Sequence, residues 1–222
     1  VTMVKPGDHV VISLLRACGR CFFCNQGQPH LCSTEFALTN ESRLHAADGT
    51  SIEQGIKVAG FAEYAVVDQS QLVSIPKDMP LDSASLLACG VITGLGAVVN
   101  TAKVGPGQSV VVIGAGGVGL NAIQGAALSG GDPIIAVDLL DSKVASALGF
   151  GATHGVNGRD GEAVLVKVQS LTGGRGADFV FITVGSPAAV AQGIPLTRRG
   201  GTLVLVGIPD DKATHPLPLA QT

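Results

Sequence analysis

A glycine-rich turn between an apolar strand and an apolar helix constrains the fold of this chain more than any other feature. The β-branched run at 110–113 leads into the sequence GAGGVG at 114–119, and an apolar helical stretch follows at 120–128. The next strand, 134–137, ends at an acidic residue, Asp138. A lone G-x-G-x-x-G is weak evidence, but here strand, helix and acidic residue stand where a dinucleotide-binding βαβ unit needs them. The pattern predicts such a unit, and a turn that binds nothing is the weaker alternative.

Each position of the turn has its own expected role in holding a pyrophosphate. Gly114 permits a tight turn, Gly116 removes a side chain that would block the phosphates, and Gly119 lets the helix pack against the strand. Free N–H groups and a partial positive charge at the helix N-terminus attract the phosphates. Gly117 and Val118 lie at this N-terminus and are expected to contact the cofactor.

Asp138 bears on which dinucleotide is bound. Its carboxylate is expected to accept hydrogen bonds from both hydroxyls of the adenosine ribose, and its charge would repel a 2′-phosphate. The residues that follow are Leu139, Leu140 and Asp141, so no arginine stands next to Asp138 to bind such a phosphate. These residues favour NAD over NADP.

The rest of the second half alternates between strands and helices, which is typical of the α/β class with a doubly wound parallel sheet. Strands are expected at 155–157, 177–183 and, after the break at Gly200-Gly201, at 203–207, with helices at 162–171 and 188–196. Ligands bind at the carboxyl ends of such strands. Further cofactor contacts are therefore expected at Thr183, Val184, Val206, Gly207 and Ile208.

Four of the five cysteines lie in one loop with the spacing C-x2-C-x2-C-x7-C, at Cys18, Cys21, Cys24 and Cys32. Four thiolates so close together can converge on one tetrahedral zinc ion, at Zn–S distances of about 2.3 Å. Disulfides are a weaker alternative, because no export signal is visible. Iron–sulfur motifs that open in the same way close after three residues and a proline follows, whereas here the gap is seven residues. A closed site of four cysteines favours a structural zinc over a catalytic one.

Composition and charge argue against several other classes of protein. A net charge of −3 gives no electrostatic basis for binding nucleic acid or an acidic membrane surface. The uncharged stretch 104–131 raises the question of a membrane span, but its proline and its glycine cluster are incompatible with one spanning helix. Neither a membrane nor a nucleic acid is an expected partner. With no signal peptide visible, the cytoplasm is the expected location.

The first half of the chain has a different texture, with short β-type runs at 9–14, 62–67 and 72–75 broken by turns. Together with the cysteine loop and the glycine turn, these features resemble the zinc-containing medium-chain alcohol dehydrogenases over essentially the whole chain. The turn Lys5-Pro6-Gly7-Asp8, the seven-residue final cysteine gap and the segment Phe61-Ala62-Glu63-Tyr64 carry the resemblance. It implies a GroES-like catalytic domain at 1–90, incomplete at its N-terminus, and a Rossmann-type NAD-binding domain at 91–222, incomplete at its C-terminus.

The resemblance also implies roles for residues outside the two motifs. The segment 86–94 resembles the stretch that supplies a ligand of the catalytic zinc, so Cys89 takes that role and Thr93 a contact with the nicotinamide. Lys143 matches a lysine that contacts the adenosine ribose. Without the family, Cys89 would be read as a buried, inert thiol. The other two catalytic ligands, a cysteine and a histidine, are expected upstream of Val1.

Some positions depart from the family's pattern. Phe36 stands where the glutathione-dependent formaldehyde dehydrogenases have an arginine that recognises the substrate carboxylate, which argues against glutathione adducts. Ile182 stands where many relatives have an acidic residue. None of the five histidines matches a ligand of the family, and they are assigned to surface or packing roles: His9, His30, His45, His154 and His215.

The function implied by the resemblance is reversible hydride transfer between an alcohol and NAD, in a homodimer or homotetramer with a structural and a catalytic zinc. Members specific for a polyol, an amino alcohol, an aryl alcohol or a thiol adduct of formaldehyde are alternatives. An alternative of another class is a non-catalytic, zinc-stabilised NAD-binding protein. These 222 residues carry one expected ligand of the catalytic zinc, so the resemblance does not imply that this chain is active alone.

Overall fold

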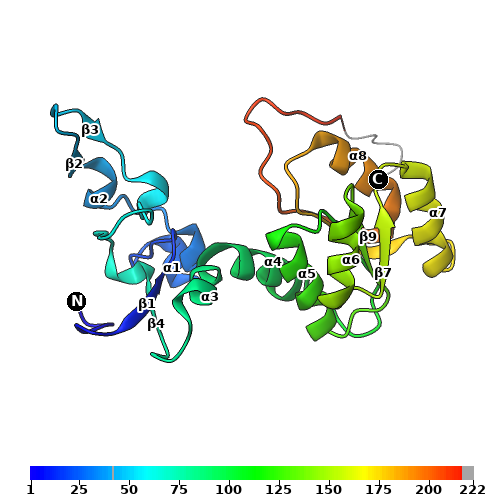
Figure 1. Ribbon diagram of the computed structural model, residues 1–222, viewed down its shortest axis with the longest axis horizontal. Coiled ribbons are helices and arrows are strands. Elements are labelled where there is room, and N and C mark those ends of the chain that lie inside the picture. Colours follow the sequence, from blue (N-terminus) through cyan, green and yellow to red (C-terminus); the bar gives the residue numbers. More distant parts are fainter. Residues whose placement is uncertain (42, 217–222) are drawn as a thin grey trace. The chain divides into compact units, whose positions relative to one another are not determined.

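The computed structural model describes residues 1–41 and 43–216, apart from the side chains of residues 39 and 40. The chain separates into two compact units, Val1–Cys89 and Gly90–Thr222 (Figure 1). Each unit is described by itself.

The first unit is built on two short antiparallel pairs of strands. Strand β1 (His9–Ile12) pairs with β4 (Leu72–Ile75), and β2 (Leu44–His45) pairs with β3 (Ser51–Ile52). Short helical turns fill the rest of the unit: α1 (Phe22–Asn25), η1 (Pro29–Leu31), α2 (Ala37–Asn40), η2 (Gly55–Lys57), η3 (Gln69–Gln71) and α3 (Leu81–Ser85).

The prediction of a strand at 62–67 is wrong. This segment has no strand pairing among the described residues. The carbonyl oxygen of Val66 instead accepts a hydrogen bond from Gln54 Nε2 at 2.7 Å. A side-chain amide thus supplies the donor that a partner strand would have supplied.

The second unit is an α/β domain with a five-stranded parallel sheet in the order β7-β6-β5-β8-β9. A helical stretch leads into it through η4 (Leu87–Val91), α4 (Ile92–Gly96) and η5 (Ala97–Ala102). The strands are β5 (Val110–Ile113), β6 (Ile134–Asp138), β7 (His154–Asn157), β8 (Ala177–Ile182) and β9 (Thr197–Leu205). The helices between them are α5 (Gly117–Leu128), α6 (Asp141–Gly149), α7 (Gly161–Leu171) and α8 (Pro187–Leu196).

Alternate residues of the central strand β5 face two separate hydrophobic cores. Val110 and Val112 belong to one core, which contains buried residues of η5, α5 and α6. Val111 and Ile113 belong to the other, which contains buried residues of α7 and α8. Because helices cover both faces, β5 is apolar at every position, as buried parallel strands are. The doubly wound parallel sheet predicted from the sequence is confirmed (Figure 1).

The strand predicted after Gly200-Gly201 begins earlier than expected. Strand β9 starts at Thr197 and runs through both glycines, with a register shift against β8 between Ala177 and Phe179. A Cβ at Gly201 would lie 3.0 Å from the carbonyl oxygen of Ala177, so glycine allows the close approach of these strands. Helix α6, which the sequence analysis does not identify, has only one buried residue, Ala147, and therefore carries a weak apolar pattern.

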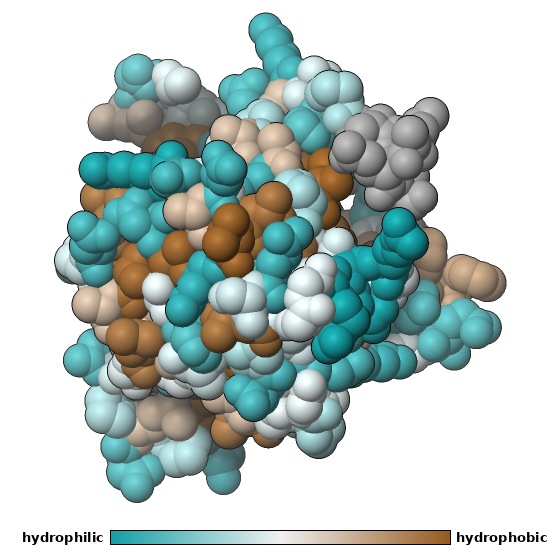
Figure 2. Space-filling model, turned by 90° about the vertical axis from the view of Figure 1, so that its right-hand side faces the viewer, coloured by the Kyte–Doolittle hydropathy of each residue, from teal (hydrophilic) through white to brown (hydrophobic). Residues whose placement is uncertain are grey.

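Exposed apolar side chains remain on the second unit, among them Leu128, Val166, Leu205 and Ile208. Figure 2 shows one face of the molecule, where hydrophobic residues lie beside polar ones. Such mixing is ordinary for a folded surface. Among the helices of the described residues, none has both the length and the apolar character needed to cross a bilayer.

A polar cluster joins the amino ends of three strands, at the edge of the sheet opposite the glycine turn. Asp178 Oδ2 accepts hydrogen bonds from the backbone N–H and the hydroxyl of Ser109, at 2.8 and 2.7 Å. Asp178 Oδ1 accepts one from Arg198 Nε at 2.6 Å. Partial burial acts to raise the pKa of Asp178, but the bonds from Ser109 and Arg198 outweigh it and lower this pKa to about 2.

Asp178→Asn is expected to lower the free energy of unfolding by about 1–2 kcal/mol at pH 7. Because the folded pKa of Asp178 lies below the unfolded value of about 3.9, the carboxylate stabilises the fold above that pH. The deficit should therefore shrink as the pH falls from about 4 towards 2. Urea unfolding followed by circular dichroism measures it, with Asp211→Asn at an exposed carboxylate as the control. A deficit that stays constant down to pH 2 contradicts the argument.

Candidate dinucleotide and metal sites

The glycine turn lies where the connections of the sheet change direction. Strand β5 is followed by a crossover to β6 on one side, whereas its other neighbour, β8, leads on to β9. Ligands of open α/β sheets bind at the carboxyl ends of strands at such a switch point. Here those ends carry Gly114 and Thr183, and the hydroxyl of Thr183 donates to the carbonyl oxygens of Ile113 and Gly114, at 3.0 and 2.7 Å.

Two glycines of the turn are explained by the fold itself. Gly114 has a φ of +100°, a conformation that residues with a side chain rarely adopt. Gly119 is buried, and a Cβ there would overlap the carbonyl oxygen of Gly114. These two positions need glycine whether or not a ligand is bound.

Gly116 has no such explanation within the described fold. Its backbone is extended, with φ −83° and ψ −170°, so any residue could adopt it. A Cβ at Gly116 would have no atom within 4 Å, and the same holds at Gly117. The space that a side chain would fill is open, and it lies at the N-terminus of α5. This is the feature that a bound pyrophosphate requires.

The N-terminus of α5 is not capped by a side chain. Gly116 is the N-cap residue, and its carbonyl oxygen accepts the Leu120 N–H at 2.8 Å. The first N–H groups of a helix have no partner within the helix itself. Those of Gly117, Val118 and Gly119 therefore stand where phosphate oxygens can accept from them, in the positive field of the helix dipole.

Asp138 ends β6 beside the turn, half-buried. Its Oδ2 accepts a hydrogen bond from the Ala115 N–H at 2.8 Å, and its Oδ1 accepts one from the Leu140 N–H at 3.0 Å. Each carboxylate oxygen has a second lone pair, so the group can still accept from ribose hydroxyls. Lys143 is exposed in the first turn of α6. The glycine turn and Asp138 are thus joined by a direct hydrogen bond.

The remaining predicted cofactor residues lie at the same edge of the sheet. The N–H groups of Val206 and Gly207 both donate to the carbonyl oxygen of Ile182, at 2.8 and 2.9 Å. A Cβ at Gly207 would overlap the backbone of Val184, so these two segments pack closely. Ile208 is 91% exposed. The structure brings these residues together with the glycine turn, and their contacts with a cofactor remain predictions.

The four lobe cysteines lie close together, as one metal ion would require. All their Sγ atoms lie within 4.8 Å of one another, and those of Cys21 and Cys32 are 3.8 Å apart. Zinc at about 2.3 Å from each sulfur of a tetrahedron places the sulfurs about 3.8 Å apart. The Sγ of Cys18 accepts hydrogen bonds from the Cys21 N–H at 3.2 Å and from the Thr34 hydroxyl at 3.0 Å. The lobe therefore fits zinc, and all five cysteines of the chain are free of disulfides.

The thiols of the lobe differ in acidity. Backbone hydrogen bonds at Cys24 and Ser33 lower the pKa of Cys21 to about 6. A bond from the Thr34 hydroxyl is the main cause that lowers the pKa of Cys18. Burial, followed by its hydrogen bond with Cys21, raises the pKa of Cys24 to about 11. Thiolates so close together repel one another, and a cation at their centre removes that repulsion.

Cys89 and Thr93 lie on consecutive helical turns but form no metal site by themselves. Cys89 is exposed in the π-helical turn η4, not buried as a cysteine in an apolar run would be, and Thr93 is exposed in α4. Within the described residues, the lobe is the only group of three or more side chains placed to hold a metal. The assignment of Cys89 to a catalytic zinc therefore stays a prediction.

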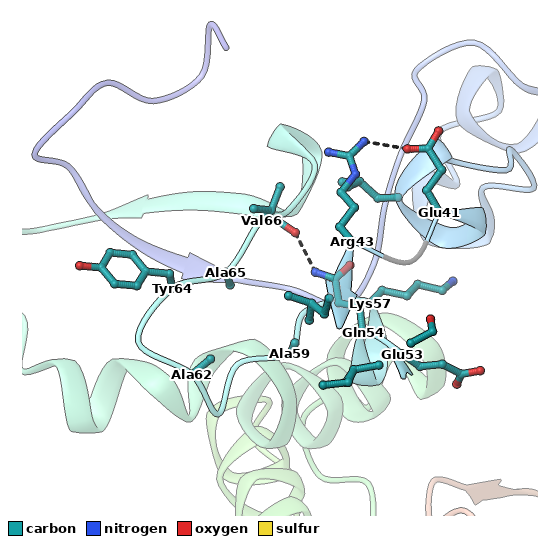
Figure 3. Close-up of a pocket in the computed structure, with 14 residues that line it drawn as sticks. Glu41, Arg43, Glu53, Gln54, Lys57, Ala59, Ala62, Tyr64, Ala65 and Val66 are labelled. Carbon is teal, nitrogen blue, oxygen red and sulfur yellow. Dashed lines mark hydrogen bonds and ion pairs between the residues drawn. The ribbon is translucent and has the colours of Figure 1, made fainter. Parts of the chain in front are cut away.

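The first unit also contains a pocket with a volume of about 640 Å³, which no sequence pattern indicates. Figure 3 shows charged side chains at its rim, including the ion pair between Arg43 and Glu41, and small apolar residues such as Ala59 and Ala62 along its wall. Two buried polar residues, Arg16 and Gln71, adjoin this wall and are not indicated by the sequence either. No local pattern marks them, because their partners lie far away in the sequence.

Two protein-family models match the chain. The alcohol dehydrogenase GroES-like domain matches residues 1–77, and the zinc-binding dehydrogenase domain matches residues 117–222. Alcohol dehydrogenase B of Mycobacterium tuberculosis is 38% identical over 211 residues, which cover 91% of this chain and 56% of that protein. The S-(hydroxymethyl)glutathione dehydrogenase of Paracoccus denitrificans is 37% identical over 221 residues, covering 94% and 59%.

Solved structures give the same result. The alcohol dehydrogenase zinc-binding domain protein from Burkholderia ambifaria matches with a TM-score of 0.89 at 35% identity, over 100% of this chain and 61% of that one. Benzyl alcohol dehydrogenase from Acinetobacter calcoaceticus matches with a TM-score of 0.87 at 33% identity, with the same coverage. The chain thus spans about three fifths of the length of these relatives. With both family domains in the family's order, this chain belongs to the zinc-containing medium-chain alcohol dehydrogenases.

Proposed function

We propose that the protein interconverts an alcohol and its aldehyde or ketone with NAD as the hydride acceptor, and that it uses zinc. The open space at Gly116 carries the cofactor part of this proposal, because nothing in the described fold requires glycine there. The family carries the reaction class. We further propose, on the resemblance alone, that the protein assembles as a homodimer or homotetramer.

Bound NAD would supply a carbon that accepts hydride. The backbone at Gly116 and the N-terminus of α5 would bind its pyrophosphate through N–H groups that are already in place. Asp138 would hold the adenosine ribose, with Lys143 as a second contact, while its bond to the Ala115 N–H keeps the turn in position. Thr93 would contact the nicotinamide. Such positioning of the reactants lowers the entropic part of the barrier.

We assign the two zinc roles to different residues. The lobe cysteines Cys18, Cys21, Cys24 and Cys32 would hold a structural ion, since four thiolates leave no position for a substrate. Cys89 would be one ligand of the catalytic ion. Among the described residues, the lobe is the only group of three or more side chains placed to hold a metal, and Cys89 lies outside it.

For the substrate, we propose a primary or secondary alcohol without a glutathione moiety. Phe36 carries no charge that could recognise a carboxylate, and its ring lies under the guanidinium of Arg16, with 5.7 Å between Cζ and the ring centroid. The structural likeness to benzyl alcohol dehydrogenase favours an aryl alcohol as the first compound to assay.

Exchanging Asp138 tests the cofactor assignment. Asp138→Ser is expected to weaken NAD binding at least about 10- to 100-fold, because the loss of one charged hydrogen bond to the ribose costs roughly 1.5–3 kcal/mol. NADP binding should improve, since the charge that repels a 2′-phosphate is removed. Titration calorimetry with both cofactors measures the ratio, with Asp141→Ser as the control. An unchanged ratio would remove the case for the ribose contact.

Turnover of alcohols tests the reaction itself. Oxidation of a panel of primary, secondary and aryl alcohols, followed by the absorbance of NADH, is expected to show turnover. NAD binding without turnover of any alcohol would favour the alternative of a non-catalytic, zinc-stabilised NAD-binding protein.

A further inference from the structure

The pocket shown in Figure 3 has one wall of strained backbone. Ile56, Lys57 and Ala59 all have positive φ, at 52°, 60° and 52°. Side chains disfavour this left-handed region, β-branched ones most of all, so such a segment persists only where its surroundings hold it. Lys57 and Ala59 line the pocket. Whatever holds this segment therefore also shapes the pocket.

Two buried polar side chains hold the segment at the carbonyl oxygen of Lys57. Arg16 Nη2 donates to this oxygen at 3.0 Å, and Gln71 Nε2 donates to it at 3.3 Å. Arg16 is 6% exposed and Gln71 is fully buried. Hydrogen bonds from the buried Arg16 guanidinium and the Gln71 amide fix the position of the Lys57 carbonyl group far better than bonds from water would.

Gln71 in turn fixes Arg16. Its Oε1 accepts hydrogen bonds from Arg16 Nε at 2.9 Å and from the Asp68 N–H at 3.1 Å. Its Nε2 also donates to the carbonyl oxygen of Ser13 at 2.7 Å. Both acceptor and both donor positions of the amide are thus used. The network is complete, and loss of one member leaves buried groups without partners.

Arg16 also stands at the base of the four-cysteine lobe. It precedes Cys18 by two residues, and its guanidinium faces the ring of Phe36, which follows Cys32 by four. Arginine over an aromatic ring is an attractive contact. The two ends of the lobe therefore meet at one side chain, and an ion that draws Cys18 and Cys32 together would keep these ends in contact.

We propose that Arg16 is a positioning residue that couples metal binding at the lobe to the shape of the pocket. With the ion bound, Arg16 is held against Phe36 and, with Gln71, fixes the carbonyl of Lys57. Without the ion, the ends of the lobe separate, the carbonyl loses a donor and the strained segment relaxes, so the pocket wall opens. The inference rests on the zinc-binding role proposed for the lobe, and it adds an effect of that zinc on the pocket wall at Lys57.

Hydrogen exchange of three amides reports on the wall. The N–H groups of Lys57, Val58 and Ala59 donate to carbonyl oxygens of Gln54 and Gly55, at 2.9–3.1 Å. These bonds should break when the segment relaxes. In the zinc-loaded chain the three amides should exchange slowly, and removing zinc with a chelator should speed their exchange at least about tenfold. The β1–β4 amides serve as the internal reference, and equal acceleration there overturns the proposal, because the ion would then only support the whole unit.

Variants of Arg16 distinguish the effect of its hydrogen bonds from the effect of metal binding. Arg16→Met keeps the apolar stem and removes the donors, so its zinc-loaded form should exchange as fast as the zinc-free wild type. Its zinc content should stay at one ion per chain, and the cobalt-substituted protein should keep the cobalt–thiolate absorption of the wild type. Arg20→Met, at an exposed arginine of the same lobe, is the matched control and should behave as the wild type.

Slow exchange in zinc-loaded Arg16→Met overturns the proposal. If that variant does not fold, Arg16→Lys decides, because lysine keeps the charge but cannot donate to Gln71 and Lys57 in the planar geometry of arginine. Slow exchange in Arg16→Lys overturns the proposal in the same way. A wild-type chain that takes up no zinc overturns this inference together with the lobe's proposed role, and the measured zinc content distinguishes that failure from a failure of coupling alone.

Discussion

Gly116→Val is expected to weaken NAD binding at least about 100-fold, which corresponds to roughly 3 kcal/mol, while the Gly90–Thr222 unit stays folded and loses at most about 1 kcal/mol, the cost of a poorer N-cap residue for α5. The backbone at Gly116 suits any residue, and a Cβ there would have no atom within 4 Å. The added side chain would instead occupy the space in which the pyrophosphate approaches the turn. Calorimetric titration with NAD measures the affinity, and thermal unfolding measures the stability.

Two further variants make this prediction specific. Gly149→Val places the same side chain at another glycine with open space around it, at the end of α6, and should leave NAD binding unchanged. Gly119→Val should instead destabilise the unit, because its Cβ would overlap the Gly114 carbonyl oxygen. If Gly116→Val binds NAD as tightly as the wild type does, the assignment of the cofactor to this turn is wrong.

The sequence predicts the second unit well because its signals are local. The apolar run at 110–113 coincides with β5, and the run ending at Asp138 coincides with the end of β6. Buried parallel strands are apolar at nearly every residue, so they can be predicted without knowing which strands they pair with or in which register. The segment 62–67 shows the opposite case. Its apolar pattern suggests a strand, but pairing depends on a partner, and Gln54 takes that place.

The candidate sites likewise divide into those that a local sequence pattern predicts and those that only the fold reveals. The cysteine spacing and the glycine turn lie within short stretches of chain, so the sequence predicts that their members come together. The Arg16 network does not lie in one stretch, since Gln71 is 55 and Lys57 41 positions away. Burial of an arginine is rare enough that no sequence pattern predicts it, and only the fold shows where its donors go.

Cys24→Ser is expected to abolish tight zinc binding by the lobe, with a loss of affinity of at least about 1000-fold. Apparent binding free energies of structural zinc reach roughly 10–16 kcal/mol at pH 7, and removing one of four thiolates removes a large share. The thiol of Cys24 is protonated at pH 7 in the absence of a metal, because burial and hydrogen bonding with Cys21 raise its pKa to about 11. The thiol must lose its proton when it binds zinc, so zinc uptake by the wild type at pH 7 should release protons and weaken as the pH falls.

Zinc content after dialysis against a chelator measures this loss, and calorimetry in buffers of different ionisation enthalpy measures the protons released. Cys89→Ser is the matched control, since Cys89 is exposed and has no part in the lobe. That variant should keep the lobe zinc, and proton release should be the same as in the wild type. Equal loss of zinc from both variants would mean that the four-cysteine cluster does not hold the ion, and the sulfur–sulfur distances within it would then need another explanation.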